Sequence, residues 1–293
     1  MAWKRSRVSR KGTRHYVPSR PRMLHHNRDK EEKRMIYATP TQNLTGICLE
    51  GEYLDFYEMV ESIYRMTGLE DDYYDPYWGV KNRLLGLCYD IRHAYQGDRE
   101  VDFVDNGVDE QIEKWQGKIL PKENVHFKVN VLFPEAVFVA LSVSDLYMFS
   151  KKYYDWTRDD TEHREDAHLA DFIRDKSNLE MLSGTILKAL GDVIGDEGLR
   201  PILKELERSD LRWEAPFYRY ITYYVDRCNI EYLKTVPDKR KDKLRNIAKR
   251  FVKPPQTYLN MKRDFEYSAK QQNCSIYHLY DPKGENYPED IEW

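Results

Sequence analysis

The stretch NVHFKVNVLFPEAVFVALSVSDLYMF, residues 124–149, contains the change of period that decides the fold class. In its first half, valine and phenylalanine alternate with His126, Lys128 and Asn130, which predicts a strand with one buried and one solvated face. Pro134 ends this alternation, and from there onward the apolar spacing is helical almost throughout. The junction therefore predicts strands before it and helices after it.

The sequence before the junction mixes β-prone and helical segments. MIYATPTQNLTGICLEG, residues 35–51, holds two β-prone runs around a turn and predicts a hairpin, and residues 99–104 predict another strand. Apolar residues at helical spacing predict two helices, one ending at Gly68 and one before Gly97. After the junction, we expect helices at about 134–155, 162–175, 178–194, 199–208, 215–234, 239–252 and 256–272.

This order of segments indicates an α+β protein. We expect a small antiparallel sheet with helices in the N-terminal half, a predominantly helical C-terminal half, and a basic N-terminal arm that is disordered or ordered by a partner. The expected regions are a basic arm at 1–34, an α+β region at 35–133, a helical region packed on it at 134–280, and an acidic C-terminal tail at 281–293.

Composition excludes several classes of protein. Hydrophobic residues make up 41% and charged residues 33% of the 293 positions, which is a composition that folds. The longest weakly charged run is interrupted by Pro134, Glu135 and Asp145, so we expect no membrane span, and no secretory signal follows the basic N-terminus. The four cysteines form no CxxC pair, which argues against a zinc knuckle or a disulfide framework. We therefore expect a cytoplasmic protein.

The basic N-terminal arm is the strongest candidate for binding an anionic partner. Residues 1–34 carry 12 Lys and Arg against 3 acidic residues, a net charge of +9, whereas the remaining residues carry a net charge of −12. The arginines alternate with Ser, Thr, Trp3 and Tyr16, residue types that contact phosphates or stack on bases. The arm could also be a solubilising tail, fold back on the acidic body, or wrap an identical body in a homo-oligomer. The candidate binding residues are Arg5, Arg7, Arg10, Lys11 and Arg14.

A second basic segment, residues 238–253, is typical of an amphipathic helix. Leu244, Ile247, Ala248 and Phe251 form one apolar stripe, and the rest of the segment is rich in Lys and Arg. Such a helix can bind nucleic acid, an anionic surface or an acidic protein, or it can be a docked surface helix whose charges are solvated. The candidate binding residues are Lys239, Arg240, Lys243, Arg245, Lys249 and Arg250.

The stretch RDDTEHREDAH, residues 158–168, concentrates groups that could act on a phosphodiester. Arg158 and His163 are separated by four residues, a spacing similar to the R-x4-6-H motif of HEPN ribonucleases, and this resemblance implies that the two act on the scissile phosphate. If the stretch is helical, its carboxylates share a face with the histidine and suit a divalent metal. The candidate metal ligands are Asp159, Glu162 and Asp166. The alternative is a capped helix start with acidic residues in its first turn.

Asp90, Arg92 and His93 form a third cluster, which could supply acid–base and anion-binding groups to a cleft. The alternative is an ordinary cationic last turn of a helix ahead of a capping glycine, Gly97.

Together these segments favour a non-enzymatic cytoplasmic interaction protein whose basic arm and basic helix engage an anionic partner, either nucleic acid or an acidic protein. One alternative is a HEPN-like or metal-dependent nuclease centred on residues 158–168, and another is an arm-exchanging homo-oligomer subunit. We expect no cofactor, apart from a divalent metal under the nuclease hypothesis, because the glycine-rich nucleotide loops and the common hydrolase motifs do not occur.

Overall fold

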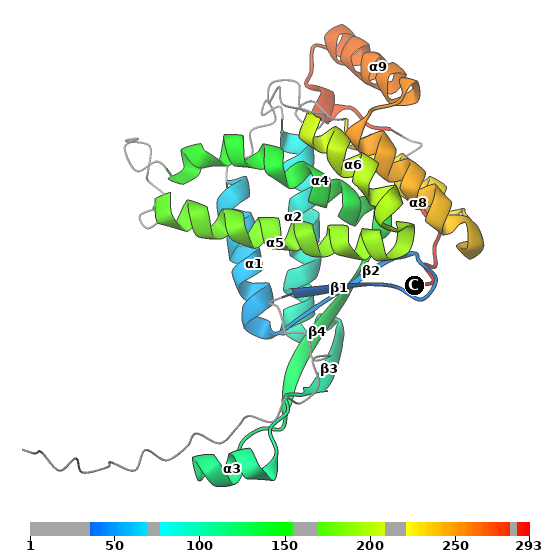
Figure 1. The fold of residues 1–293 in the computed structure, drawn as a ribbon. Coiled ribbons are helices and arrows are strands. Elements are labelled where there is room, and N and C mark those ends of the chain that lie inside the picture. Colours follow the sequence, from blue (N-terminus) through cyan, green and yellow to red (C-terminus); the bar gives the residue numbers. More distant parts are fainter. Residues whose placement is uncertain (1–35, 69–76, 155–168, 209–220, 282–285) are drawn as a thin grey trace, which may run out of the picture. The chain divides into compact units, whose positions relative to one another are not determined.

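The computed structural model describes residues 36–68, 77–154, 169–208, 221–281 and 286–293. Met35–Trp293 form one compact unit that combines a sheet with helices (Figure 1). The α+β fold predicted from the sequence is confirmed, with its antiparallel sheet in the N-terminal half.

Four antiparallel strands form the sheet, in the order β1-β2-β4-β3. Leu49 of β2 lies opposite Val129 of β4, and both side chains are buried in the core. β3 pairs with the first part of β4, as far as Lys128, and among the described residues no strand pairs with the last residues of β4 on that side. The strands are β1 (Ile36–Pro40), β2 (Gly46–Gly51), β3 (Glu100–Asp105) and β4 (Glu123–Leu132).

The predicted alternation of buried and solvated faces on β4 has two exceptions, Val125, which is 41% exposed on the apolar face, and His126, which is buried on the polar face. Val129 and Val131 are buried, whereas Lys128 on the opposite face is partly exposed. His126 lies on the same polar face as Lys128 but is buried, because the Glu50 carboxylate covers it, with Oε1 2.6 Å from Nδ1.

The helices surround and extend this sheet. Figure 1 shows α4 and α5 side by side, and both helices pack against α1. The described helices are α1 (Tyr53–Thr67), α2 (Trp78–His93), α3 (Glu110–Gln116), α4 (Phe133–Ser150), α5 (Leu169–Ile194), α6 (Asp196–Arg208), α7 (Tyr223–Leu233), α8 (Pro237–Val252) and α9 (Gln256–Gln272). Shorter helical turns occur at Ala94–Asp98, Lys151–Tyr154 and Ile276–His278.

The prediction of separate helices at 162–175 and 178–194 is wrong. α5 runs unbroken from residue 169 to residue 194, because residues 176 and 177 continue the helical repeat. Ser177 Oγ donates to the Ile173 carbonyl at 2.8 Å inside the helix, and the buried face continues at Leu179.

The apolar run after Pro134 is the central helix of the core. Pro134 lies in the first turn of α4, where a missing N–H leaves no helical hydrogen bond unmade. Phe133–Tyr154 is the one helical stretch among the described residues that is long and apolar enough to cross a membrane, yet 67% of its apolar window is buried inside the fold. Phe138, for example, packs edge to face on Phe251 of α8, with ring centroids 5.3 Å apart. The run is therefore accounted for by core packing.

A buried carboxylate joins α1 to α5. Asp175 is 0% exposed and accepts hydrogen bonds from Arg65 Nε at 2.6 Å, Ser62 Oγ at 2.9 Å and Tyr154 Oη at 2.8 Å. Burial alone would raise the pKa of Asp175, but the bonds from Arg65 and Tyr154 lower it below its usual value. The carboxylate is therefore ionised in the folded protein.

Replacing Asp175 with Ala should lower the free energy of unfolding by about 3–5 kcal/mol, because it leaves the Arg65 guanidinium without its buried partner. Urea denaturation of wild type and variant measures this loss. A carboxyl with a lowered folded pKa stabilises the fold above its unfolded pKa and loses that contribution as pH falls, so the gap should narrow in acid. Asp192→Ala, with an exposed side chain, is the control, and an equal loss in both variants would contradict the prediction.

Candidate functional site

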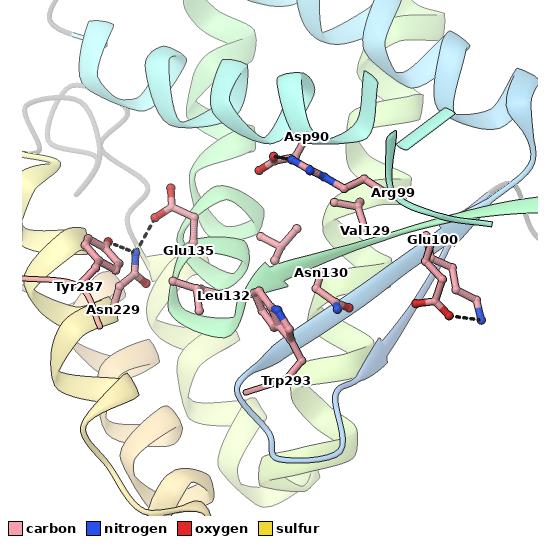
Figure 2. A pocket seen from close by; sticks show the side chains of 12 residues that line it. Asp90, Arg99, Glu100, Val129, Asn130, Leu132, Glu135, Asn229, Tyr287 and Trp293 are labelled. Carbon is pink, nitrogen blue, oxygen red and sulfur yellow. Dashed lines mark hydrogen bonds and ion pairs between the residues drawn. The ribbon is translucent and has the colours of Figure 1, made fainter. Parts of the chain in front are cut away.

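A groove lies between α2, the end of β4 and the first turn of α4. It consists of two cavities of about 510 and 480 Å³ that share Asp90, Val131 and Glu135 as lining residues. Figure 2 shows the first cavity, with Asp90 and Arg99 on one side and Trp293 on the other. This groove is a concave candidate for a binding site, lined by both apolar and charged side chains.

Arg83 of α2 fixes one end of the groove. Its Nη1 donates to Glu135 Oε2 at 3.1 Å and to Asp226 Oδ1 at 2.9 Å, and its Nη2 donates to the Thr222 carbonyl at 2.9 Å. Burial opposes the charge, but the carboxylates of Glu135 and Asp226 outweigh it and raise the pKa of Arg83. One guanidinium thus holds α2, α4 and α7 together.

Asn229 and Tyr287 extend this network. Asn229 Nδ2 donates to Glu135 Oε2 at 2.8 Å and to Tyr287 Oη at 3.0 Å, and Tyr287 Oη donates to Asp226 Oδ1 at 2.9 Å. Asn229 is 2% exposed, and its amide oxygen has no hydrogen-bond partner among the described residues. Burial next to Asp226 raises the pKa of Tyr287, so its hydroxyl stays protonated.

The C-terminal segment forms part of the groove wall. Thr45 Oγ1 donates to the Glu292 carbonyl, and the Trp293 ring packs where a Cβ on Gly46 would meet it at 2.9 Å. The last two residues of the predicted acidic tail, Glu292 and Trp293, therefore lie against the start of β2.

The outer edge of β3 carries a row of backbone groups directed away from the sheet. The Asn106 N–H donates to the Lys122 carbonyl in the β3–β4 register, and because bonded pairs alternate in antiparallel ladders, even-numbered residues of β3 and β4 bond to each other. The odd-numbered residues Val101, Phe103 and Asp105 therefore direct their backbone groups away from β4, along the outer edge of β3. In the described part of the chain, no strand covers that edge.

The β3–α3–β4 hairpin carries exposed apolar side chains. α3 was not predicted, although Asp109 caps it through bonds from the Gln111 and Ile112 N–H groups, both 2.9 Å, and Gly117 ends it at φ 64°. Figure 1 places α3 at the far end of the hairpin, away from the other helices. We define the hairpin surface as Val101 (39% exposed), Phe103 (64%), Ile112 (36%), Trp115 (84%), Ile119 (96%) and Val125 (41%).

Of the predicted cluster on α2, the structure brings only Asp90 into the groove. Arg92 Nη1 donates to Tyr64 Oη at 3.2 Å, and His93 Nδ1 lies 2.7 Å from Asp98 Oδ2. The three side chains do not converge on one cleft, because each faces a different neighbour.

The predicted cations of α8 divide into one buried residue, three residues in ion pairs and two exposed residues. Arg240 is buried and donates to the Thr235 carbonyl at 3.0 Å and to the Asn43 carbonyl at 2.6 Å, so it fastens α8 to the β1–β2 turn. Lys243 and Arg250 both pair with Glu231, and Arg245 pairs with Asp242. Lys239 and Lys249 are exposed and have no side-chain partner in the described part of the protein.

Several predicted site residues lie outside the described residues. They are Arg5, Arg7, Arg10, Lys11 and Arg14 of the arm, and Arg158, Asp159, Glu162, His163 and Asp166 before α5. Their proposed roles stay predictions. Among the residues that are described, no group of three or more His, Cys, Asp or Glu side chains gathers in a way that could hold a metal ion.

Sequence reasoning missed the groove. Arg83, Glu135, Asp226, Asn229 and Tyr287 come from four separate parts of the chain, and none belongs to a motif. Local spacing carried no signal, since each residue is an ordinary polar position of its own segment.

Arg83→Leu should lower the free energy of unfolding by about 3 kcal/mol or more, because it leaves the Glu135 and Asp226 carboxylates facing each other without a cation. Asp226→Leu should also destabilise, and the double variant should lose less than the sum of the two, with a coupling of about 0.5–3 kcal/mol. Urea denaturation of the four proteins measures the coupling. Strictly additive losses would refute the predicted coupling. Arg99→Leu, which alters an exposed arginine, is the control.

The comparisons with known proteins identify the family. No curated protein and no solved structure matches the chain significantly. A family model described as a domain of unknown function, DUF6904, matches residues 36–293, which include the sheet, the groove and every described helix. The chain therefore belongs to the DUF6904 family.

Proposed function

We propose that this protein acts by binding another protein, which adds an extended strand to the uncovered edge of β3. The observation that carries the proposal is an edge strand whose neighbouring side chains, Phe103 and Val125, are apolar and exposed. Exposed unpaired strand edges pair readily with other chains, and contiguous exposed apolar side chains mark interaction surfaces. The proposal retains the interaction class expected from the sequence but assigns it to a different surface.

The two faces of β3 specify the chemistry of the partner strand. Val101 and Phe103 point to the apolar face, whereas Glu100 and Asp102 point to the opposite face. On that polar face, three carboxylates lie near one lysine, Lys128, which is 2.8 Å from Asp102 and 3.9 Å from Glu50 and from Glu100. A strand that alternates apolar residues with Lys or Arg complements both faces, at about 0.2–1 kcal/mol for each cross-strand pair.

A second copy of β3 fits this edge less well. Pairing two copies would bring the Glu100 and Asp102 carboxylates of both chains onto one face, and directly opposed like charges destabilise a sheet. Acidic side chains thus protect the edge from self-pairing while they leave it open to a basic strand.

A labelled synthetic peptide that alternates Val or Phe with Lys should bind the protein, and the same peptide with Glu in place of Lys should bind far more weakly. Val101→Pro should reduce binding of the Lys peptide at least about tenfold, because it removes an outward N–H without removing a bond to β4. Fluorescence anisotropy measures both affinities. Glu100→Lys should reduce the difference in affinity between the Lys peptide and the Glu peptide.

Leu259→Ser on α9 is the matched control, since it alters an exposed apolar side chain on another element. Equal affinity for the two peptides, or binding unchanged by Val101→Pro in a variant that melts like wild type, would refute the proposal.

A second candidate function is binding of an anionic partner by α8 and the basic arm. The observations that favour it are the exposure of Lys239 and Lys249, which have no side-chain partner among the described residues, and the net charge of +9 on residues 1–34. Nucleic acid suits this charge pattern best, because arginines and lysines neutralise successive phosphates. The nuclease hypothesis for residues 158–168 and the arm-exchanged oligomer stay predictions.

Affinity for a labelled single-stranded RNA should fall steeply as salt rises, since each neutralised phosphate releases counterions. Removal of residues 1–34 should abolish most of this binding, and Lys239→Glu together with Lys249→Glu should weaken the remainder several-fold. Filter binding at several salt concentrations measures the effect. Lys188→Glu on α5 is the control, and a truncated protein that binds RNA as tightly as the full chain would exclude the arm as the contact.

A further inference from the structure

We propose that the groove binds a protonated amine, either a small free amine or the side chain of a lysine on a peptide. The site is the cavity of about 510 Å³ between Asp90 and Asn229. This inference is separate from the strand-binding proposal, because it centres on Asn229, Glu135 and Asp90 and not on the outer edge of β3, although Glu100 contributes to both surfaces.

The buried amide oxygen of Asn229 needs a hydrogen-bond donor. The amide nitrogen of Asn229 is held by the Glu135 carboxylate and Tyr287 Oη, so the oxygen cannot turn toward them. Figure 2 shows the oxygen on the cavity side of the residue. An acceptor buried without a partner costs about 1–3 kcal/mol, and a donor group of a ligand would remove that cost.

Two further acceptors line the same cavity. Glu135 uses only Oε2 for its bonds to Arg83 and Asn229, which leaves Oε1 without a partner among the described residues. Across the cavity, Asp90 receives one long bond from Arg99, at 3.4 Å. A ligand with several donors is therefore favoured over one with acceptors, and an ammonium group has three donors and no acceptor.

The charge of the lining favours a cation. Three carboxylates, on Asp90, Glu100 and Glu135, face two cations, Arg99 and Lys128, and both cations are already next to carboxylates. Arg83 behind the wall is balanced by Asp226 in addition to Glu135. The Trp293 ring also lines the cavity, and tryptophan is the side chain that best attracts a cation over its face.

The test is isothermal titration of the full chain with four probes. They are cadaverine, lysine blocked by an acetyl group at its α-amine and a methylamide at its carboxyl so that the side-chain amine stays charged, pentanediol as the neutral match, and glutarate as the anionic match. We expect the two amines to bind and the diol and glutarate not to bind. Tighter binding of cadaverine identifies a free amine as the ligand, and tighter binding of the lysine derivative identifies a peptide side chain.

Asn229→Ala should weaken amine binding at least about tenfold, or about 1.4 kcal/mol. Asn246→Ala on α8, an exposed asparagine outside the groove, should leave it unchanged. Asp90→Asn gives a second variant that keeps the shape of the wall, should the Asn229 variant fail to fold, and it should weaken binding several-fold.

Three results would overturn the inference. The first is an absence of binding by either amine at millimolar concentration, and the second is equal affinity for cadaverine and pentanediol. The third is amine affinity unchanged in Asp90→Asn and in a folded Asn229→Ala.

Discussion

The partly buried ion pairs between Arg83 and two carboxylates organise the part of the molecule where function is proposed. A guanidinium largely removed from water requires anionic partners, and Arg83 takes one from the start of α4, Glu135, and one from α7, Asp226. Glu135 lies in the first turn of α4, which begins directly after the end of β4, so the same contact fixes how the sheet passes into the core helix. The groove, the orientation of Asn229 and the position of the C-terminal segment all depend on this arrangement.

Helices cover one part of the sheet and leave another part open to solvent. β1 and β2 pack on α5 and α4, whereas the β3–α3–β4 hairpin extends beyond the helices and leaves its apolar face in solvent (Figure 1). Burial of this face by a partner would remove Phe103 and Trp115 from water, at roughly 25 cal/mol for each Å² of apolar surface. The fold therefore separates a rigid groove from a projecting edge, and the two proposed binding activities use different parts of the sheet.

The fold class could be predicted because it follows from the local spacing of apolar residues. The site could not be predicted, because it depends on contacts between residues that are distant in the chain. The alternation up to Val131 and the helical spacing after Pro134 are visible in the sequence, and they give the α+β class. Burial of Arg83 and Asn229 depends instead on partners distant in the chain. Charge runs proved ambiguous for the same reason: Arg240 belongs to a basic helix by sequence, yet the structure uses it to bind backbone carbonyls.

The central claim, that the outer edge of β3 accepts a partner strand, is tested most directly by residue-resolved amide exchange in the full chain, with and without the alternating Val/Lys peptide. The account predicts that the peptide slows exchange at Val101 and Asp105, whose N–H groups point outward, and leaves the rate at Asp102 nearly unchanged because that N–H already bonds to β4. Protection that is absent from β3, or that appears equally at Asp102 and Val101, would contradict it.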